Sequence, residues 1–271
     1  SRNANDGISL AQTAEGALSK VGDMLQRMRE LAVQAGNATN SKGDREALNA
    51  ELVQLRDEVD RVAKTTSFNG KKVLDGSFTG GVFQVGANSG DNITVGALAN
   101  TKVDQLGKTE FGTSSVTGIV DASKTAAANN MSTADVTIVI TGANQVSAQV
   151  TIAKDADVTG DEALGRVVQA INSKTADTGI VAFLAEDGKS IQYRAEKNAD
   201  GVLASATMAV SGTAAGVTAL LANPTTANTD QTGIHKMDIK TQAGAWESLQ
   251  RIDSALDKVS SARAELGAIQ T

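Results

Sequence analysis

Apolar residues recur three and four positions apart in three stretches of the sequence, two near its beginning and one near its end. In chain order the runs are Ala11, Ala14, Leu18, Val21, Leu25, Met28 and Ala32; Leu48, Leu52, Leu55, Val59 and Val62; and Ala245, Leu249, Ile252, Leu256 and Val259. This spacing is typical of helices that pack along their length against other helices. It predicts that both ends of the chain meet in one helical bundle. We expect helices over about 5–35 and 44–64, the second with Asp44 as its N-cap.

Strand patterns occupy the region between these helices. Residues 82–85 and 92–95 alternate apolar and polar positions, as a hairpin with one buried face does. Further on, β-branched runs at 136–140, 146–152, 180–184 and 191–194 predict two more hairpins. Between these two hairpins, Thr159 and Glu162 form a capping box in front of a helix with one apolar face. The order ββαββ predicts a small sheet that carries one helix.

These elements predict an α+β protein with two domains, because 271 residues exceed what one compact core usually supports. The first is an elongated helical rod, a coiled-coil-like bundle of the N- and C-terminal helices plus the first hairpin. We assign residues 1–104 and 236–271 to this discontinuous core domain. Residues 105–235, rich in Thr, Ala, Ser, Val and Gly, form a separate, inserted α+β domain.

The composition narrows the classes of function. A formal net charge of -6 disfavours nucleic-acid binding, which requires a basic face. Cys is absent, so the chain has no disulfides or thiolate chemistry. No apolar run is long enough to span a bilayer, and no signal peptide is recognisable at the start, so membrane insertion is not expected. The chain begins without Met, and both of its ends lie in helical pattern; we interpret it as part of a longer protein.

Three sequence features resemble metal-binding, phosphate-binding or catalytic sites, but each match is weak. Residues 155–161 start like a calcium loop, but the twelfth position, where a Glu would bind the ion, is Arg166. The tripeptide at 188–190 matches the end of a phosphate-binding loop, whereas Phe183 stands where the first glycine belongs. His235 is the only histidine and is interpreted as a surface linker residue. We therefore expect no enzyme activity, no metal site and no cofactor.

One surface feature remains open. Leu31 lies beside the seam of the first helix, one turn from Arg27, and Glu51 lies beside the seam of the second helix. A leucine framed by charged residues is a possible protein-binding spot, since apolar groups near Arg are common in binding hot spots. Alternatively, Leu31 only widens the buried stripe of its helix. The pattern does not decide between the two.

Four motifs carry a resemblance to a known family. They are SRNANDGIS at 1–9, LQRMRELAVQ at 25–34, FNG at 68–70 and LGAIQ at 266–270. In this order they resemble bacterial flagellin over the first hundred residues and the last thirty. The resemblance implies a structural subunit of the flagellar filament, with the rod in a densely packed tube and the middle domain projecting outward.

The resemblance also implies partners and a location. They are other flagellin subunits, the flagellar export machinery and its chaperone, and the secreted, extracellular bacterial flagellum. Because flagellins extend further at both ends, this chain by itself is expected to be monomeric. Flagellins are also ligands of a vertebrate Toll-like receptor, and the motif implies receptor-binding residues at Gln26, Arg27, Arg29, Glu30, Leu31, Gln34 and Glu51. The rival hypothesis is a surface adhesin that binds a ligand through residues 105–235 alone.

Overall fold

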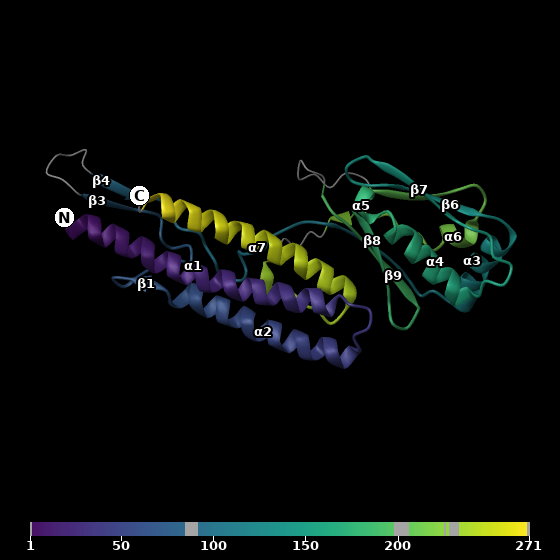
Figure 1. Cartoon of the computed structure of the whole chain (residues 1–271), viewed down its shortest axis with the longest axis horizontal. Coiled ribbons are helices and arrows are strands. Elements are labelled where there is room, and N and C mark those ends of the chain that lie inside the picture. Colours follow the sequence, from purple (N-terminus) through teal and green to yellow (C-terminus); the bar gives the residue numbers. More distant parts are fainter. Residues whose placement is uncertain (1, 85–91, 198–205, 225, 228–232, 270–271) are drawn as a thin grey trace. The chain divides into compact units, whose positions relative to one another are not determined.

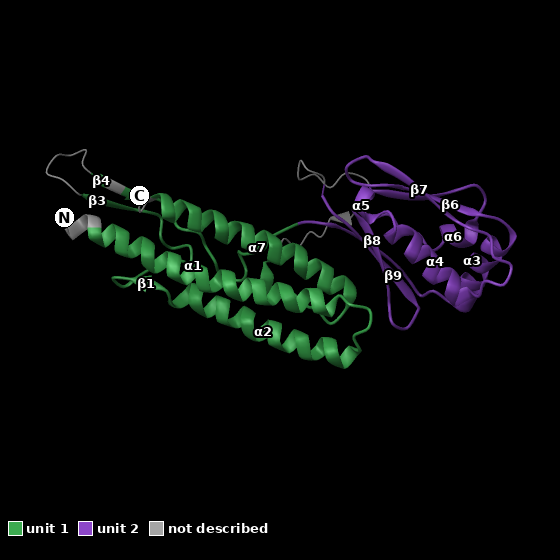
Figure 2. Cartoon of the chain, viewed as in Figure 1, with its two compact units in different colours: residues 1–109, 231–271 green, residues 110–230 purple. Residues whose placement is uncertain are grey.

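The computed structural model divides into two compact units (Figures 1 and 2). It describes residues 2–84, 92–197, 206–224, 226–227 and 233–269. Unit 1 comprises residues 1–109 and 231–271, and unit 2 comprises residues 110–230. The sequence analysis placed the two boundaries at 104/105 and 235/236. Each unit has a hydrophobic core of its own and is described by itself.

Three long helices form the frame of unit 1. They are α1 (Arg2–Ala35), α2 (Lys42–Thr65) and α7 (Gln242–Ile269). Helix α1 packs against both of the others (Figure 1). All seven apolar residues of the first predicted run are buried, as expected for a helix with neighbours on two sides. In the other two runs, residues such as Leu52 and Ile252 are buried, whereas Leu48, Leu55, Leu249 and Leu256 are half-buried.

The connection between α1 and α2 corrects one prediction. The N-cap of α2 is Ser41, whose hydroxyl accepts a hydrogen bond from the Asp44 backbone N–H at 3.2 Å. The Asp44 carboxylate accepts in return from the Ser41 backbone N–H at 3.0 Å. Asp44 is therefore the third helical residue of a capping box rather than the cap itself. The buried Arg45 donates to the Ala35 carbonyl at 3.0 Å and so satisfies the end of α1.

Short strands complete unit 1. Strands β1 (Ser67–Phe68) and β2 (Lys71–Lys72) pair across a turn in which Asn69 and Gly70 have φ of 47° and 77°. This is the left-handed geometry that Asn-Gly turns adopt. Strands β3 (Gly81–Gln84) and β4 (Asn92–Val95) form the predicted hairpin. Its loop, including Val85, lies outside the described residues, as does most of the polar run before Gly233. A 3-10 turn, η1 (Ile234–Lys236), precedes α7.

Unit 2 contains two antiparallel sheets. The three-stranded sheet has the order β10 (Thr207–Ser211), β6 (Val136–Thr141), β7 (Ser147–Ile152). The four-stranded sheet has the order β11 (Thr226–Ala227), β5 (Gly112–Thr117), β9 (Ser190–Ala195), β8 (Ile180–Leu184). Its helices are α3 (Asp121–Thr133), α4 (Gly160–Asn172), α5 (Thr175–Thr178) and α6 (Ala215–Thr218).

The expected single sheet with one helix is therefore wrong, although both predicted hairpins and the capping box of α4 are confirmed. Three helices were missed: the four-residue α5 and α6 and the longer α3. Helix α3 has the sequence DASKTAAANNMST, which has hardly any apolar periodicity. The pairing of β10 with β6 joins segments far apart in sequence, and local pattern does not report such pairing. Tyr193 is fully buried in the shared core and donates to the Leu220 carbonyl; burial raises the pKa of its hydroxyl.

Candidate association site on the helical bundle

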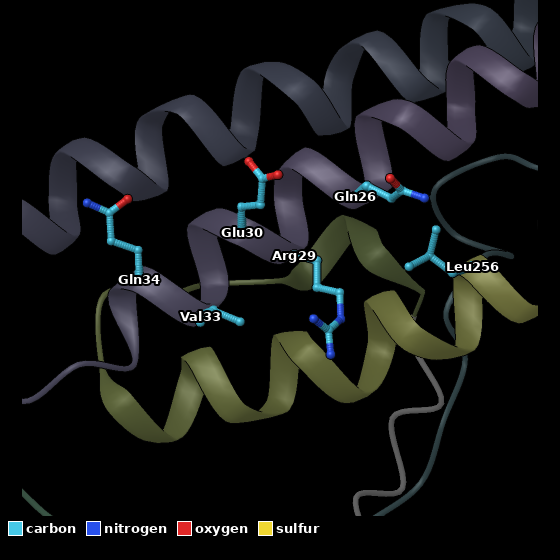
Figure 3. A pocket seen from close by; sticks show the side chains of 6 residues that line it. All are labelled: Gln26, Arg29, Glu30, Val33, Gln34 and Leu256. Atoms are coloured by element: carbon cyan, nitrogen blue, oxygen red, sulfur yellow. The ribbon is translucent and has the colours of Figure 1, made fainter.

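The exposed side of α1 is the floor of an open groove in unit 1 (Figure 3). The groove has a volume of about 580 Å³. Its lining residues are Gln26, Arg29, Glu30, Val33 and Gln34 of α1 and Leu256 of α7. These α1 residues share a face because they are three or four positions apart. Four of the seven predicted receptor-binding residues, Gln26, Arg29, Glu30 and Gln34, thus lie together.

Arg27 joins α1 to α2 at one side of this groove. Its Nη2 lies 2.7 Å from Oε1 of Glu51 on α2, and its Nη1 lies 2.9 Å from Oε2 of Glu30 one turn further along α1. Hydrogen bonds to Glu30 and Glu51 raise the pKa of the Arg27 guanidinium. The side chains of Arg27 and Glu51 remain 49% and 43% exposed. The guanidinium is therefore held in one position while a partner can still reach it.

Arg29 joins α1 to α7 at the other side. Its Nε donates to Oδ1 of Asp253 at 2.8 Å, across 224 residues of sequence. Figure 3 shows Arg29 directed toward α7 and Glu30 directed toward α2. Arg29 lines the groove itself, whereas Arg27 is linked to it through its ion pair with Glu30, so both arginines hold charged groups of the groove in place. Asp253 had no signal in the sequence, because its proximity to Arg29 depends on how α7 packs.

The structure decides the open question about Leu31. Its side chain is 0% exposed and belongs to the core of unit 1, so the hypothesis of an exposed leucine is wrong. The sequence analysis assumed one seam, whereas α1 lies against both α2 and α7 and buries two stripes. Leu31 and Ala35 extend the buried surface beyond the seam residues. Leu31 is a core residue and offers no surface to a partner.

The exposed apolar residue of this region is Val33, which the sequence analysis did not single out. It is 53% exposed and lies in the groove with Leu256. Its position one turn from Arg29 and off the heptad seam was a signal that could have identified it. Figure 3 places Arg29 between Val33 and Leu256. The candidate site therefore combines two separate apolar side chains with charged and polar residues of α1, and such a mixture is common on protein-binding surfaces.

The structure also places the weaker candidate sites, the apparent calcium loop and the tripeptide at 188–190. Arg166 forms an ion pair with Asp155, so the apparent calcium loop is closed by a cation. Within the described ranges, no group of three or more His, Asp or Glu residues could hold a metal ion. Residues 188–190 lie at a hairpin between β8 and β9, as predicted. Among the described residues, no helix is long and apolar enough to cross a membrane.

His235 differs from its interpretation as a surface linker. It belongs to η1, is half-buried, and is held through its backbone: its N–H donates to the Val103 carbonyl at 3.1 Å. Its carbonyl accepts from Nη1 of Arg56 at 2.9 Å. These bonds attach η1 to α2 and to the segment around Val103. His235 is therefore a structural residue of unit 1.

Comparisons with known proteins agree with this architecture. Residues 1–79 match the family model for the bacterial flagellin N-terminal helical region. Flagellin A of Vibrio anguillarum is 37% identical over 281 aligned positions, which cover 99% of this chain and 66% of that protein. Flagellin A of Vibrio cholerae is 38% identical with the same coverage. The solved structure of FliC from Burkholderia pseudomallei has a TM-score of 0.52 and 24% identity over 97% of this chain and 98% of that chain, which shows a shared fold.

Both ends of the chain form one helical bundle, and an α+β unit is inserted between them. Together with the comparisons, this architecture defines the class as a structural protein. The comparisons make this assignment specific: the chain belongs to the bacterial flagellin family. Membership of this family makes it a structural protein and not an enzyme, as the sequence analysis expected. The chain spans 66% of the length of the curated flagellins named above.

Proposed function

We propose that this chain is the larger part of a flagellar filament subunit in which unit 1 makes the contacts between subunits. The observation that supports the proposal is the alignment of 99% of the chain with flagellins. The groove adds a physical reason, because Val33 and Leu256 offer apolar surface on either side of Arg29, which is held by its ion pair with Asp253. Burial of such surface contributes about 25 cal/mol per Å² and is repeated by symmetry in a polymer.

Polymerisation onto filament seeds tests this proposal. In the full-length protein, we expect Val33→Asp to slow elongation at least about tenfold, since a buried unpaired carboxylate costs more than 1.4 kcal/mol. Val120→Asp is the matched control, because Val120 is 58% exposed but belongs to unit 2. Electron microscopy and sedimentation measure the growth. Equal elongation by both variants would contradict a subunit contact at the groove.

In the same proposal, the subunit is exported by the flagellar machinery with a chaperone and functions outside the cell. The chain without further flagellin segments is monomeric. Sedimentation of this chain alone tests the last point: a single species at the monomer mass is expected. Growth of the isolated chain on filament seeds would contradict it.

The second part of the proposal is recognition by the flagellin-sensing Toll-like receptor through Arg27, Glu51 and the groove residues Gln26, Arg29, Glu30 and Gln34. The ion pairs of Arg27 support it, because a guanidinium that is already held in place loses little entropy when a partner binds. Leu31 contributes by supporting this geometry and not by contact. Since the same face is proposed to contact neighbouring subunits, receptor binding requires the monomer.

Binding of soluble variants to the receptor ectodomain tests this part. Arg27→Ala and Glu51→Ala are each expected to weaken binding at least about tenfold, the range of hot-spot residues. Arg61→Ala is the matched control, because Arg61 forms a similar exposed ion pair with Glu58 elsewhere on α2. Unchanged affinity in Arg27→Ala and Glu51→Ala would refute the proposed site. The filament proposal would remain, since seeded growth tests it separately.

A further inference from the structure

The outer face of the three-stranded sheet in unit 2 presents nine uncharged side chains in a grid. The register of the sheet sets them in three rows: Thr207, Thr141 and Ser147; Ala209, Val139 and Gln149; Ser211, Thr137 and Thr151. Residues that alternate with them, such as Ile138 and Met208, are buried in the core of unit 2. The grid residues on β7 and β10 are exposed, and those on the central strand β6 are half-buried between their neighbours.

Four of the six hydroxyl groups in the two outer rows, those on β6 and β7, are already paired with each other. The Oγ1 atoms of Thr137 and Thr151 are 3.0 Å apart, and Oγ1 of Thr141 lies 2.8 Å from Oγ of Ser147. Covering this face therefore leaves those hydroxyls with partners, which lowers the cost of removing water. The middle row contributes the apolar groups of Val139 and Ala209.

The absence of charge from the grid favours a second copy of the same chain as its occupant. The sequence has 25 basic and 31 acidic residues, and none of them lies in the grid. The charges next to the hairpin ends, Asp135 and Lys154, have opposite signs, and the Lys154 backbone N–H donates to Oδ1 of Asp135 at 2.7 Å. Two copies with a net charge of -6 each repel least where neither presents charge.

The order of the rows is also self-complementary. Because hydroxyl rows flank the row of Ala209, Val139 and Gln149, a two-fold rotation brings hydroxyls opposite hydroxyls and Val139 close to its own counterpart. The area is small: three strands about 4.8 Å apart and five residues at about 3.3 Å cover roughly 250 Å². A stable dimer buries about 800 Å² on each partner, so this contact is weak and becomes populated where copies are held close together.

We infer that this grid packs against the same grid of a second copy of the chain. The contact is separate from the groove of unit 1 and does not depend on the proposed filament function. Paramagnetic relaxation in solution detects such weak contacts, and a chain without Cys accepts a single nitroxide label cleanly. Val146 is 47% exposed and lies just outside the grid, next to Ser147. Val146→Cys protein at natural isotope abundance, carrying the nitroxide, is mixed with isotope-labelled wild-type protein. Amides of β6, β7 and β10 are expected to broaden, whereas a label at Lys189→Cys in the β8–β9 turn leaves them sharp.

Charge substitutions at the centre of the grid then test the two-fold arrangement. Val139→Glu and Val139→Lys, each paired with itself, are expected to reduce the broadening about tenfold or more, because like charges meet near the axis. A mixture of the two variants is expected to restore it, which also shows that both are folded. Equal broadening from both labels would overturn the inference, as would failure of the mixture to recover. A wild-type chain without any broadening would overturn it too, because two copies would then not meet at this face.

Discussion

Truncation of Leu31 separates folding from recognition at the candidate site. The side chain is 0% exposed within the core of unit 1, although the family motif places it among the receptor-binding residues. Leu31→Ala removes three buried carbons, which corresponds to about 2.4 kcal/mol of lost transfer free energy. The cavity left behind brings the expected decrease in the free energy of unfolding to about 2–5 kcal/mol.

Calorimetry measures this effect. For a unit of this size, such a loss lowers the Tm of unit 1 by about 5–15 °C. Because unit 2 has its own core, its transition is expected to stay in place. Val33→Ala is the matched control on the same helix; at 53% exposure it is expected to change stability by less than about 0.5 kcal/mol.

Leu31→Met provides the decisive comparison, because it conserves side-chain volume and costs less than about 1.5 kcal/mol. It is expected to retain receptor binding, whereas direct contact by Leu31 would make binding sensitive to both substitutions at temperatures where the chain is folded. A Leu31→Ala variant as stable as Val33→Ala would refute the burial of Leu31 and the two-sided packing of α1.

Two further predictions concern unit 2. Gly142→Ala places a Cβ against the Thr178 carbonyl oxygen, and it is expected to lower the free energy of unfolding of unit 2 by about 1–3 kcal/mol. At Gly165 no atom lies within 4 Å of an added Cβ, so Gly165→Ala is expected to stabilise α4 by about 0.5–1 kcal/mol. Thermal melts compare the two, and equal shifts would contradict the close approach at Gly142. Hydrogen bonds from the Thr159 backbone and hydroxyl lower the pKa of Glu162, so its stabilising contribution is present above pH 4.5 and is lost as the pH falls through the folded-state pKa. Acid titrations followed by circular dichroism are expected to show a shallower loss of stability in Glu162→Gln; an unchanged slope would argue against the capping box.

The sequence by itself determined those elements whose signals are local. The heptad spacing identified three helices, because contact between helices requires apolar residues every three or four positions. Alternation identified both hairpins of unit 2, and Thr159 with Glu162 identified the start of α4. Four short motifs, at 1–9, 25–34, 68–70 and 266–270, indicated the family. Arg27 and Glu51 were also located correctly as neighbours, since each lies beside a seam that brings α1 and α2 together.

Tertiary structure alone decided which residues of the candidate site are exposed. The helical period fixes the face of α1 on which Leu31 lies, but only the position of a second neighbouring helix decides whether that face is covered. The pairing of Arg29 with Asp253 has the same origin, because 224 residues separate two side chains that meet only when α7 packs on α1. Burial of Leu31 and exposure of Val33 thus depend on how many helices surround α1. The apolar periodicity of a single helix does not reveal how many neighbours it has.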